Sequence, residues 1–357
     1  MSLTFDHQTL GQRVIFGAGA AVPNAVAALE SLGAERVLLV ADIVAMEIAD
    51  AIAARVPVIE RIHDIVQHVP AEKAHAAVVR ARETNSDAIV AIGGGSSIGL
   101  AKIVARDVGL PIVAVPTTFA GSEATDVWGV TEAERKITGV DPRVLPTVVV
   151  YDASLSAGLP GSLAVASGLN AAAHAVDSLW APRADPINRA LGSEGLKTIV
   201  SGLRSLNEDS TDLAARERLL YGAYLSAVAF ASAGSAMHHK ICHALGGTYN
   251  LPHAETHSIV LGYVIAFNGP AAPEAQARIS AAFDGAPGAT GLFELRRELN
   301  APRSLADIGF AESSISEAAR IILPSIPESN PRPVTQSDLE SILRDAWAGV
   351  AASQESP

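Results

Sequence analysis

The sequence has little cysteine, a deficit of positive charge and no long apolar run. One cysteine, Cys242, among 357 residues excludes an intramolecular disulfide and predicts a reducing, cytoplasmic environment. Lys and Arg total 26 against 38 Asp and Glu, and the resulting net charge of −12 argues against a nucleic-acid partner. The N-terminus lacks the pattern of a signal peptide. The longest near-apolar stretch, Ala223 to Met237, is too short to span a bilayer, so we expect a buried helix and no membrane partner.

Apolar residues make up 49% of the chain, enough for the two domains that its length suggests. The first 150 residues alternate between strand and helix patterns, which favours a parallel sheet with crossover helices. The predicted strands are Arg13–Phe16, Arg36–Val40, Asp87–Ile92, Pro111–Val115 and Thr147–Tyr151. The predicted helices are Ala21–Leu32, Met46–Ala54, Ala71–Thr84 and Ser97–Asp107.

The second half of the chain has helical periodicity and almost no strand pattern. Leu159, Pro160 and Gly161 mark the change, so we predict an α/β dinucleotide-binding domain at 1–158 and an all-helical domain at 159–357. Further breaks are expected at Ala181-Pro182, at Gly246-Gly247 and in the Pro-rich segment Leu323–Pro333.

A run of glycines follows the third predicted strand directly. Three glycines let the backbone approach a phosphate, and the N-terminus of the next helix offers free N–H groups. The run Gly93, Gly94, Gly95, Ser96 and Ser97 therefore predicts a pyrophosphate site, with a tight turn as the alternative. The earlier pair Gly17 and Gly19 lacks the third small residue of the dinucleotide fingerprint, and we interpret it as a turn.

Three further positions are candidates for cofactor binding. Asp42 follows the second strand, where a carboxylate can accept hydrogen bonds from both ribose hydroxyls and repel a 2′-phosphate; it can equally cap the next helix. Thr117 and Thr118 follow the fourth strand, where hydroxyls face the ligand crevice of an open parallel sheet. Lys136 can reach a ribose or phosphate, although on spacing alone it is a solvated surface residue.

Histidine is concentrated in the second half of the chain. Five of the ten histidines lie between His238 and His257, and a sixth is His174. Asn170 and His174 share one helix face, as do His239 and His243, and His253 is expected to return in a loop. Two helices and a loop would thus bring Asn170, His174, His239 and His253 together, as in a metal site between helices. Without a carboxylate, such a site should bind metal more weakly.

These motifs carry a family resemblance. The glycine run, Pro116-Thr117-Thr118, Gly168–Ala175 and His239–Gly247 with Pro252-His253 resemble the iron-containing alcohol dehydrogenases over nearly the whole chain. The resemblance implies a nicotinamide cofactor in a cleft between two domains and a homodimer. It also implies cofactor contacts at Asp42, Gly93 to Ser97, Thr117, Thr118 and Lys136, and it places His243 near the nicotinamide without making it a ligand.

Within the family the chain is similar to the maleylacetate reductase branch. Asn170 matches a metal-ligand Asp of the other members, Gly99 matches an Asp that often follows their glycine run, and the segment Leu251–His257 carries a second His. This branch reduces the conjugated C=C bond of 2-maleylacetate to 3-oxoadipate, so the substrate would be a small dicarboxylate. Alternatives are a metal-dependent alcohol or polyol dehydrogenase of the family and a lyase similar to dehydroquinate synthase.

The resemblance leads to specific expectations for the chemistry. We predict NADH as the cofactor with NADPH possible, His243 as the proton donor, and His174, His239 and His253 as the groups that polarise the ketone. We also predict that no metal is required, with Asn170, His174, His239 and His253 as a relict cluster, because an enolate can be stabilised by histidine hydrogen bonds.

Overall fold

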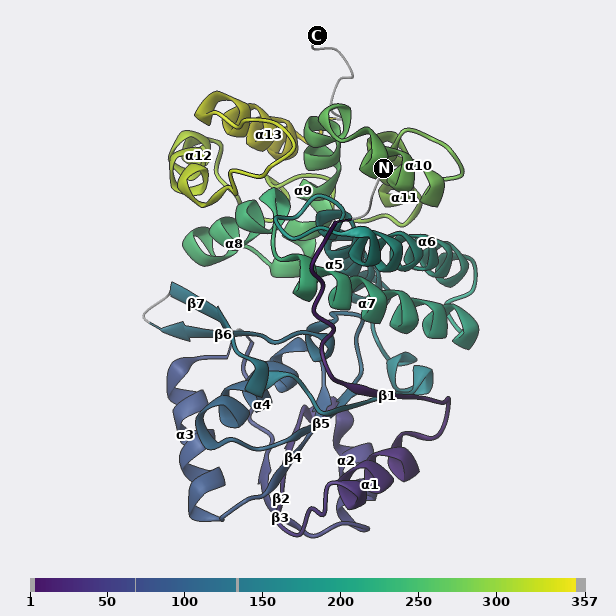
Figure 1. Cartoon of the computed structure of the whole chain (residues 1–357), viewed down its shortest axis with the longest axis vertical. Coiled ribbons are helices and arrows are strands. Elements are labelled where there is room, and N and C mark those ends of the chain that lie inside the picture. Colours follow the sequence, from purple (N-terminus) through teal and green to yellow (C-terminus); the bar gives the residue numbers. More distant parts are fainter. Residues whose placement is uncertain (1–3, 68, 133–134, 351–357) are drawn as a thin grey trace. The chain divides into compact units, whose positions relative to one another are not determined.

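The structure, a computed structural model, describes residues 4–67, 69–132 and 135–350 (Figure 1). The chain forms two compact units, one from Leu10 to Leu159 and the other from Pro160 onward. The segment up to Thr9, which the sequence placed with the first domain, groups with the second unit instead. A hydrogen bond of 2.7 Å between Nδ1 of His7 and Oδ2 of Asp185 connects this segment to the second unit.

The first unit is built on a six-stranded sheet in which all pairs are parallel, in the order β1-β8-β5-β4-β2-β3. The strands are β1 (Arg13–Phe16), β2 (Val37–Ala41), β3 (Val58–Ile62), β4 (Ala88–Gly93), β5 (Ile112–Pro116) and β8 (Val148–Tyr151). The central strands β2, β4 and β5 are buried at every residue, as their continuous apolar sequences indicate. The parallel sheet that the sequence predicted is therefore confirmed.

Helices cover both faces of this sheet. They are α1 (Ala21–Ser31), α2 (Met46–Ala53), α3 (Ala71–Glu83) and α4 (Gly95–Val108). The helices α1 and α2 pack together on one face and α3 and α4 on the other (Figure 1). Small alanines on α1, such as Ala25 and Ala28, are fully buried and bring that helix close to the strands.

Three strands were not predicted. The edge strand β3 reads Val-Ile-Glu-Arg-Ile, and its central charged residues conceal the short apolar pattern. The other two, β6 (Val127–Glu132) and β7 (Arg135–Val140), form an antiparallel two-stranded sheet. Their sequences mix charged, glycine and apolar residues, because a two-stranded ribbon has no fully buried face that demands an apolar run.

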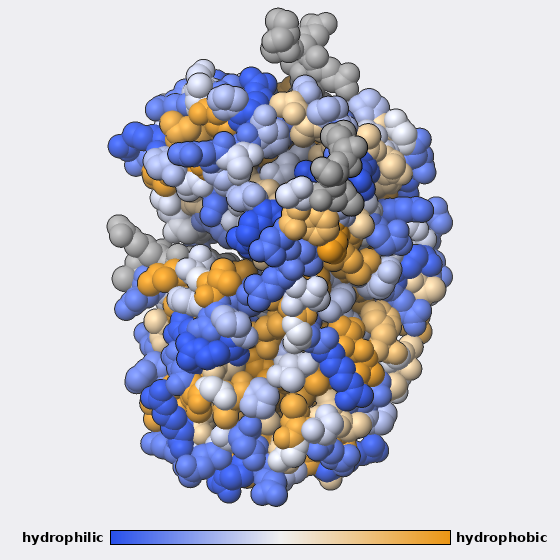
Figure 2. Space-filling model, in the orientation of Figure 1, coloured by the Kyte–Doolittle hydropathy of each residue, from blue (hydrophilic) through white to orange (hydrophobic). Residues whose placement is uncertain are grey.

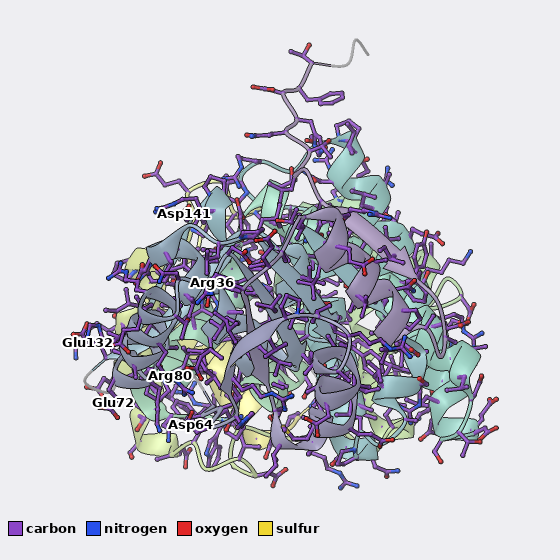
Figure 3. All side chains as sticks on the ribbon, turned by 90° about the horizontal axis from the view of Figure 1, so that it is seen from below. Arg36, Asp64, Glu72, Arg80, Glu132 and Asp141 are labelled. Carbon is purple, nitrogen blue, oxygen red and sulfur yellow. The ribbon has the colours of Figure 1, made fainter. Side chains whose placement is uncertain are left out.

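Hydrophilic and hydrophobic residues are mixed on the visible surface (Figure 2), and Arg36 and Arg80 are among the charged side chains labelled in Figure 3. Both of these arginines connect elements of the first unit. Nε of Arg36 donates to the carbonyls of Thr84 and Asn85, both at 3.0 Å, and so links the start of β2 to the end of α3. Arg80 of α3 pairs with Glu60 of β3. Exposed ion pairs contribute at most about 1 kcal/mol each, so the apolar sheet core is the main source of stability.

The second unit is helical throughout its described part. Its helices are α5 (Gly161–Ser178), α6 (Pro186–Glu208), α7 (Leu213–Ala233), α8 (Met237–Tyr249), α9 (His253–Asn268), α10 (Pro273–Ala282), α11 (Gly288–Glu298), α12 (Ile315–Ile322) and α13 (Gln336–Ala348). No single helix among the described residues is long and apolar enough to cross a membrane, although α7 and α8 pass that test jointly across a 97° bend.

Two helix boundaries differ from the prediction. The apolar stretch from Ala223 to Met237 is not one helix, because Gly234, with a φ of +92°, ends α7. Gly246 and Gly247 do not end α8, which continues to Tyr249 and ends where Asn250 adopts a left-handed φ of +52°. Glycine inside a helix is only mildly unfavourable, whereas the left-handed residue closes it.

Candidate functional site

The glycine run lies at the carboxyl end of β4. Gly93 ends the strand with a φ of +140°, Gly94 is the N-cap and α4 begins at Gly95, two residues earlier than predicted. Ser96 and Ser97 therefore belong to the first helical turn, where N–H groups lack partners within the helix. An anion placed there would meet the positive end of the α4 dipole.

Side chains from three strand ends gather around this run. A methyl group on Gly93 would lie 2.4 Å from Oγ of Ser97 and 3.4 Å from Cβ of Asp42, and one on Gly94 would lie 3.0 Å from Cγ2 of Thr118. Positions 93 and 94 are therefore glycine because their neighbours leave no room for a side chain. Since β3 lies on one side of β2 and β4 on the other, Asp42 and Gly93 also flank the point where the strand order reverses.

The other predicted cofactor residues occupy different surroundings. Thr117 follows β5, and its amide donates to the carbonyl of Gly93 at 3.1 Å. Asp42 caps the short 3₁₀ turn Ile43–Ala45, but its Oδ1 accepts from the Val44 amide at a long 3.5 Å. Lys136 lies on β7, and its side chain is outside the described part of the structure.

The first glycine pair forms a turn. The amides of Gly19 and Ala21 both donate to the carboxylate of Asp152 at 2.9 Å, which fixes the start of α1. A carboxylate in this position occupies the donors that a phosphate would need. The structure thus agrees with the interpretation of Gly17 and Gly19 as a turn.

We expect Gly93→Ala to destabilise the protein by roughly 1–3 kcal/mol, because a side chain at this φ is strained and would collide with Ser97. The matched control is Gly95→Ala, whose added methyl would meet only Ala120 Cβ at 3.8 Å. Chemical denaturation measures both free energies of unfolding, and quenching of protein fluorescence measures NADH binding. Equal stability of the two variants would contradict the crowding argument.

The second group of predicted residues lies inside the helical unit. Asn170 and His174 come from α5, His239 and His243 from α8, and His253 from α9. His253 is the first residue of α9 rather than part of a loop, because Pro252 sets the extended backbone that precedes the helix. The site is therefore assembled from three helices.

The aromatic rings of this group are in direct contact. The rings of His174 and His239 are stacked with centroids 5.0 Å apart, and Phe230 of α7 packs against both. The ring centroid of His243 lies 5.9 Å from that of His239 and 6.2 Å from that of His253. The four histidines predicted to act together do lie in one cluster.

Asp177 orients one of these rings. Its Oδ2 accepts from Nδ1 of His239 at 2.8 Å, from the backbone amide of His239 at 3.2 Å and from that of Ala236 at 3.0 Å. Nδ1 of His239 therefore carries the proton, and its Nε2 presents a lone pair. A carboxylate behind a histidine is a common arrangement around metal ligands. Asp177, which also lies on α5, was not predicted from the sequence, although its position three residues after His174 places it on nearly the same helix face.

His238 and His257 also belong to the cluster and were not assigned a role from the sequence. Nε2 of His238 lies 2.9 Å from Nδ1 of His257, and both residues are completely buried. His257 follows His253 by one helical turn, a spacing that was visible in the sequence. On α8, the ring of His238 meets His257 of α9.

Burial keeps the deep rings neutral. The pKa of His174 falls to about 4 and that of His238 to about 3, because the imidazolium form loses its hydration. The pKa values of His239 and His257 are also lowered well below the usual histidine value by burial, and neighbouring histidines add to the effect. Neutral imidazole is the form that binds metals.

Several buried nitrogen and oxygen atoms of the cluster have no hydrogen-bond partner among the described residues. Among the described residues, no hydrogen bond is made by Asn170 Oδ1, His174 Nδ1, His239 Nε2 or His257 Nε2. Leaving such an atom buried and unpaired costs about 1–3 kcal/mol. A divalent cation would satisfy these nitrogen and oxygen lone pairs, so the residues present fit a metal.

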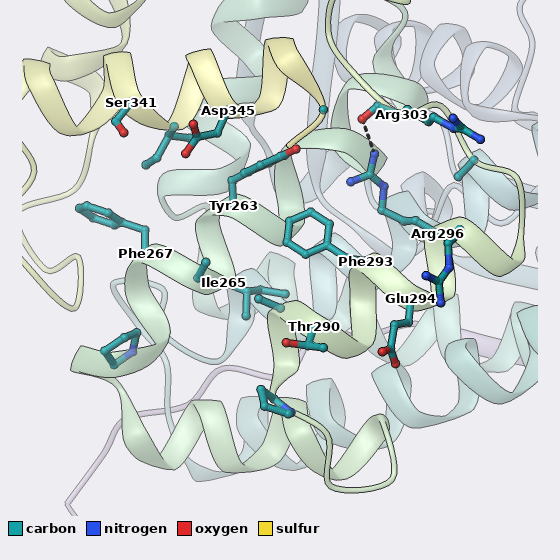
Figure 4. A pocket seen from close by; sticks show the side chains of 18 of the residues that line it. Tyr263, Ile265, Phe267, Thr290, Phe293, Glu294, Arg296, Arg303, Ser341 and Asp345 are labelled. Carbon is teal, nitrogen blue, oxygen red and sulfur yellow. Dashed lines mark hydrogen bonds between the residues drawn. The ribbon is translucent and has the colours of Figure 1, made fainter. Parts of the chain in front are cut away.

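A cavity of about 1260 Å³ lies elsewhere in the helical unit, among α9, α11 and α13 (Figure 4). It is lined by Tyr263, Phe293 and Asp345 among others. Arg296 in its wall is committed to structure, donating to the carbonyls of Pro302 at 2.6 Å and Arg303 at 3.2 Å. The described lining contains none of the predicted site residues, so we assign the chemistry to the histidine cluster.

Comparison with known proteins gives consistent matches. An iron-containing alcohol dehydrogenase model matches residues 11–153, and the C-terminal model of the Fe-containing alcohol dehydrogenase family matches 164–347. The chain is 42% identical over 349 residues to a maleylacetate reductase of Pseudomonas sp. strain P51, covering 97% of this chain and 99% of the relative.

Solved structures of the same family are also similar to this chain. An iron-containing alcohol dehydrogenase from Corynebacterium glutamicum is 48% identical with a TM-score of 0.96, covering 99% of this chain and 100% of the other. A maleylacetate reductase from Agrobacterium tumefaciens is 35% identical with a TM-score of 0.93, covering 98% and 100%.

The expectation that no metal is required is wrong. Both family models are those of iron-containing enzymes, and one ring nitrogen of each of His238, His239 and His257 lies within 4.8 Å of the other two, as a metal site requires. The prediction failed because it counted the missing carboxylate at Asn170 but not the buried, unpaired nitrogens that only the fold brings together. The chain is an oxidoreductase that belongs to the iron-containing alcohol dehydrogenase family.

Proposed function

We propose that this chain is a maleylacetate reductase, which uses NAD(P)H to reduce the C=C bond of 2-maleylacetate to 3-oxoadipate. The observation that carries the proposal is the similarity to maleylacetate reductases at 38–42% identity over nearly the whole chain. Asn170 supports it, since an amide there repels a dicarboxylate substrate less than a carboxylate would.

The electron flow is that of a conjugate reduction. Hydride from the nicotinamide adds to the alkene carbon β to the ketone, negative charge develops on the ketone oxygen, and the α-carbon then takes a proton. A bound divalent cation supplies Lewis-acid stabilisation of developing negative charge. By the family resemblance, Asn170, His174, His239 and His253 would hold it.

We assign to His243 the role of donating the proton that the α-carbon takes. It lies one turn after His239 on α8, beside the ring that Asp177 orients, and it is half-buried, so it can exchange its proton with solvent. The deeper His238 and His257 are held neutral by burial and make poor proton donors.

For the cofactor, we propose that Gly93 to Ser97 bind the pyrophosphate and that Thr117, Thr118 and Lys136 contribute further contacts. The support is the gathering of Asp42, Ser97 and Thr118 around the glycines at the switch point of the sheet. We also propose a cytoplasmic homodimer, on the basis of the single, buried Cys242 and the family resemblance.

A metal-dependent alcohol dehydrogenase remains a second candidate, because the Corynebacterium glutamicum protein at 48% identity is described as an iron-containing alcohol dehydrogenase. One assay separates the two. NADH oxidation by the metal-loaded enzyme should be fast with maleylacetate and slow with simple aldehydes. The reverse preference would reject the proposal.

We expect Asp42→Ala to reduce the preference for NADH over NADPH. A hydrogen bond to a charged group contributes about 1.5–3 kcal/mol, so loss of the ribose contact should weaken NADH binding roughly tenfold or more. NADPH should lose less, because repulsion of its 2′-phosphate disappears. The measurement is kcat/KM with each cofactor.

The matched control is Asp141→Ala, because Asp141 also caps a short 3₁₀ turn, accepting from the Arg143 amide at 2.9 Å. This variant should leave the cofactor ratio unchanged. If Asp42→Ala weakens both cofactors equally, Asp42 is only a cap.

A further inference from the structure

His257 has no role in the family's ligand pattern of Asn170, His174, His239 and His253. Its ring lies between two residues of that pattern, with centroids 4.8 Å from His239 and 4.4 Å from His253. The residue is completely buried, and its Nε2 has no partner among the described residues. The fold thus places an additional nitrogen lone pair next to the residues that would hold the metal.

His238 fixes the orientation of this ring. Its Nε2 lies 2.9 Å from Nδ1 of His257, much as Asp177 Oδ2 lies 2.8 Å from Nδ1 of His239. When Nδ1 of His257 donates this hydrogen bond, its proton is fixed there and Nε2 is free to coordinate. Metal-binding histidines usually have such an outer partner, which sets both tautomer and ring direction.

We propose that His257 is a metal ligand through Nε2 and that His238 is its positioning residue. The carboxylate that other family members place at position 170 is absent here, and His257 supplies a donor atom in its place. The exchange replaces a hard, charged oxygen by a neutral imidazole, which suits zinc, nickel or copper at least as well as iron. The proposal rests on the family's metal and not on the proposed substrate, so metal binding tests it without maleylacetate.

The experiment titrates metal-free protein with Zn²⁺ in a calorimeter. His257→Gln should weaken Zn²⁺ binding on the order of 10²-fold or more, because a ligand is lost. His238→Gln should weaken it by about 10–100-fold and less than His257→Gln, since the amide oxygen can still accept from Nδ1 of His257. His75→Ala removes an exposed histidine of α3 and should have no effect.

A second measurement counts ligands directly. Pulsed electron paramagnetic resonance of Cu²⁺-loaded protein should find one fewer coordinated imidazole in His257→Gln than in the native chain, and an unchanged number in His238→Gln. If His257→Gln fails to fold, as thermal unfolding of the metal-free form would reveal, ¹⁵N NMR of histidine-labelled, Zn²⁺-loaded native protein still tests the assignment. It should show a coordinated Nε2 and a protonated Nδ1 for His257.

Two results would overturn the proposal. The first is a Zn²⁺ affinity of His257→Gln within about twofold of native, with the same imidazole count. It would mean that His257 is not a ligand and that only the residues of the family pattern hold the metal. An equal loss of affinity and of one imidazole in His238→Gln and His257→Gln would make His238 a direct ligand and remove its positioning role.

Discussion

Replacing His243 with Ala should lower kcat for maleylacetate reduction on the order of 10²–10⁴-fold, the contribution expected of one general acid. NADH binding should stay close to native, because the proposed cofactor residues lie at the strand ends around Gly93 and not on α8. Stopped-flow and steady-state kinetics of NADH oxidation measure the first effect, and fluorescence titration measures the second.

The pH profile distinguishes an acid from a packing residue. Loss of the donor should remove or shift the limb of the kcat profile that reports the acid, which a merely structural defect would not do. His243→Gln serves as a control of similar shape that cannot donate a proton from imidazolium. If His243→Ala retains near-native kcat and an unchanged limb, the proton comes from another group.

Asp177→Ala should destabilise the protein by several kcal/mol, because each buried donor left without an acceptor costs about 1–3 kcal/mol. The amides of Ala236 and His239, the His239 ring and the Trp180 indole, whose Nε1 lies 3.3 Å from Asp177 Oδ1, would all lose their acceptor. The start of α8 and the tautomer of His239 depend on the same carboxylate, so metal affinity should fall as well. Chemical denaturation and Zn²⁺ titration measure the two effects.

Asp212→Ala is the matched control for Asp177. Asp212 is a partly exposed N-cap whose Oδ1 accepts from the Ala215 amide at 3.0 Å, and its loss should cost only about 1 kcal/mol. Comparable losses in the two variants would mean that Asp177 acts as an ordinary helix cap and not as the centre of a buried network.

The sequence by itself determined the parallel sheet, the glycine run and the family. Buried parallel strands require continuous apolar residues, so β2, β4 and β5 were visible directly. A phosphate-binding turn needs glycines at fixed positions next to a strand, so it can be recognised from the local sequence. The edge strand β3 and the β6–β7 pair have no recognisable sequence pattern, because their faces are only partly buried.

The remaining members of the histidine cluster, Asp177, His238 and His257, were decided by the tertiary structure. Helical spacing placed Asn170 with His174 and His239 with His243, but it could not show that Asp177 reaches His239 or that His238 of α8 meets His257 of α9. Those contacts join residues 62 and 19 positions apart, and they depend on how three helices pack. Whether a buried nitrogen is paired or unpaired follows from that packing, and the unpaired nitrogens among the described residues are what fit the metal of the family.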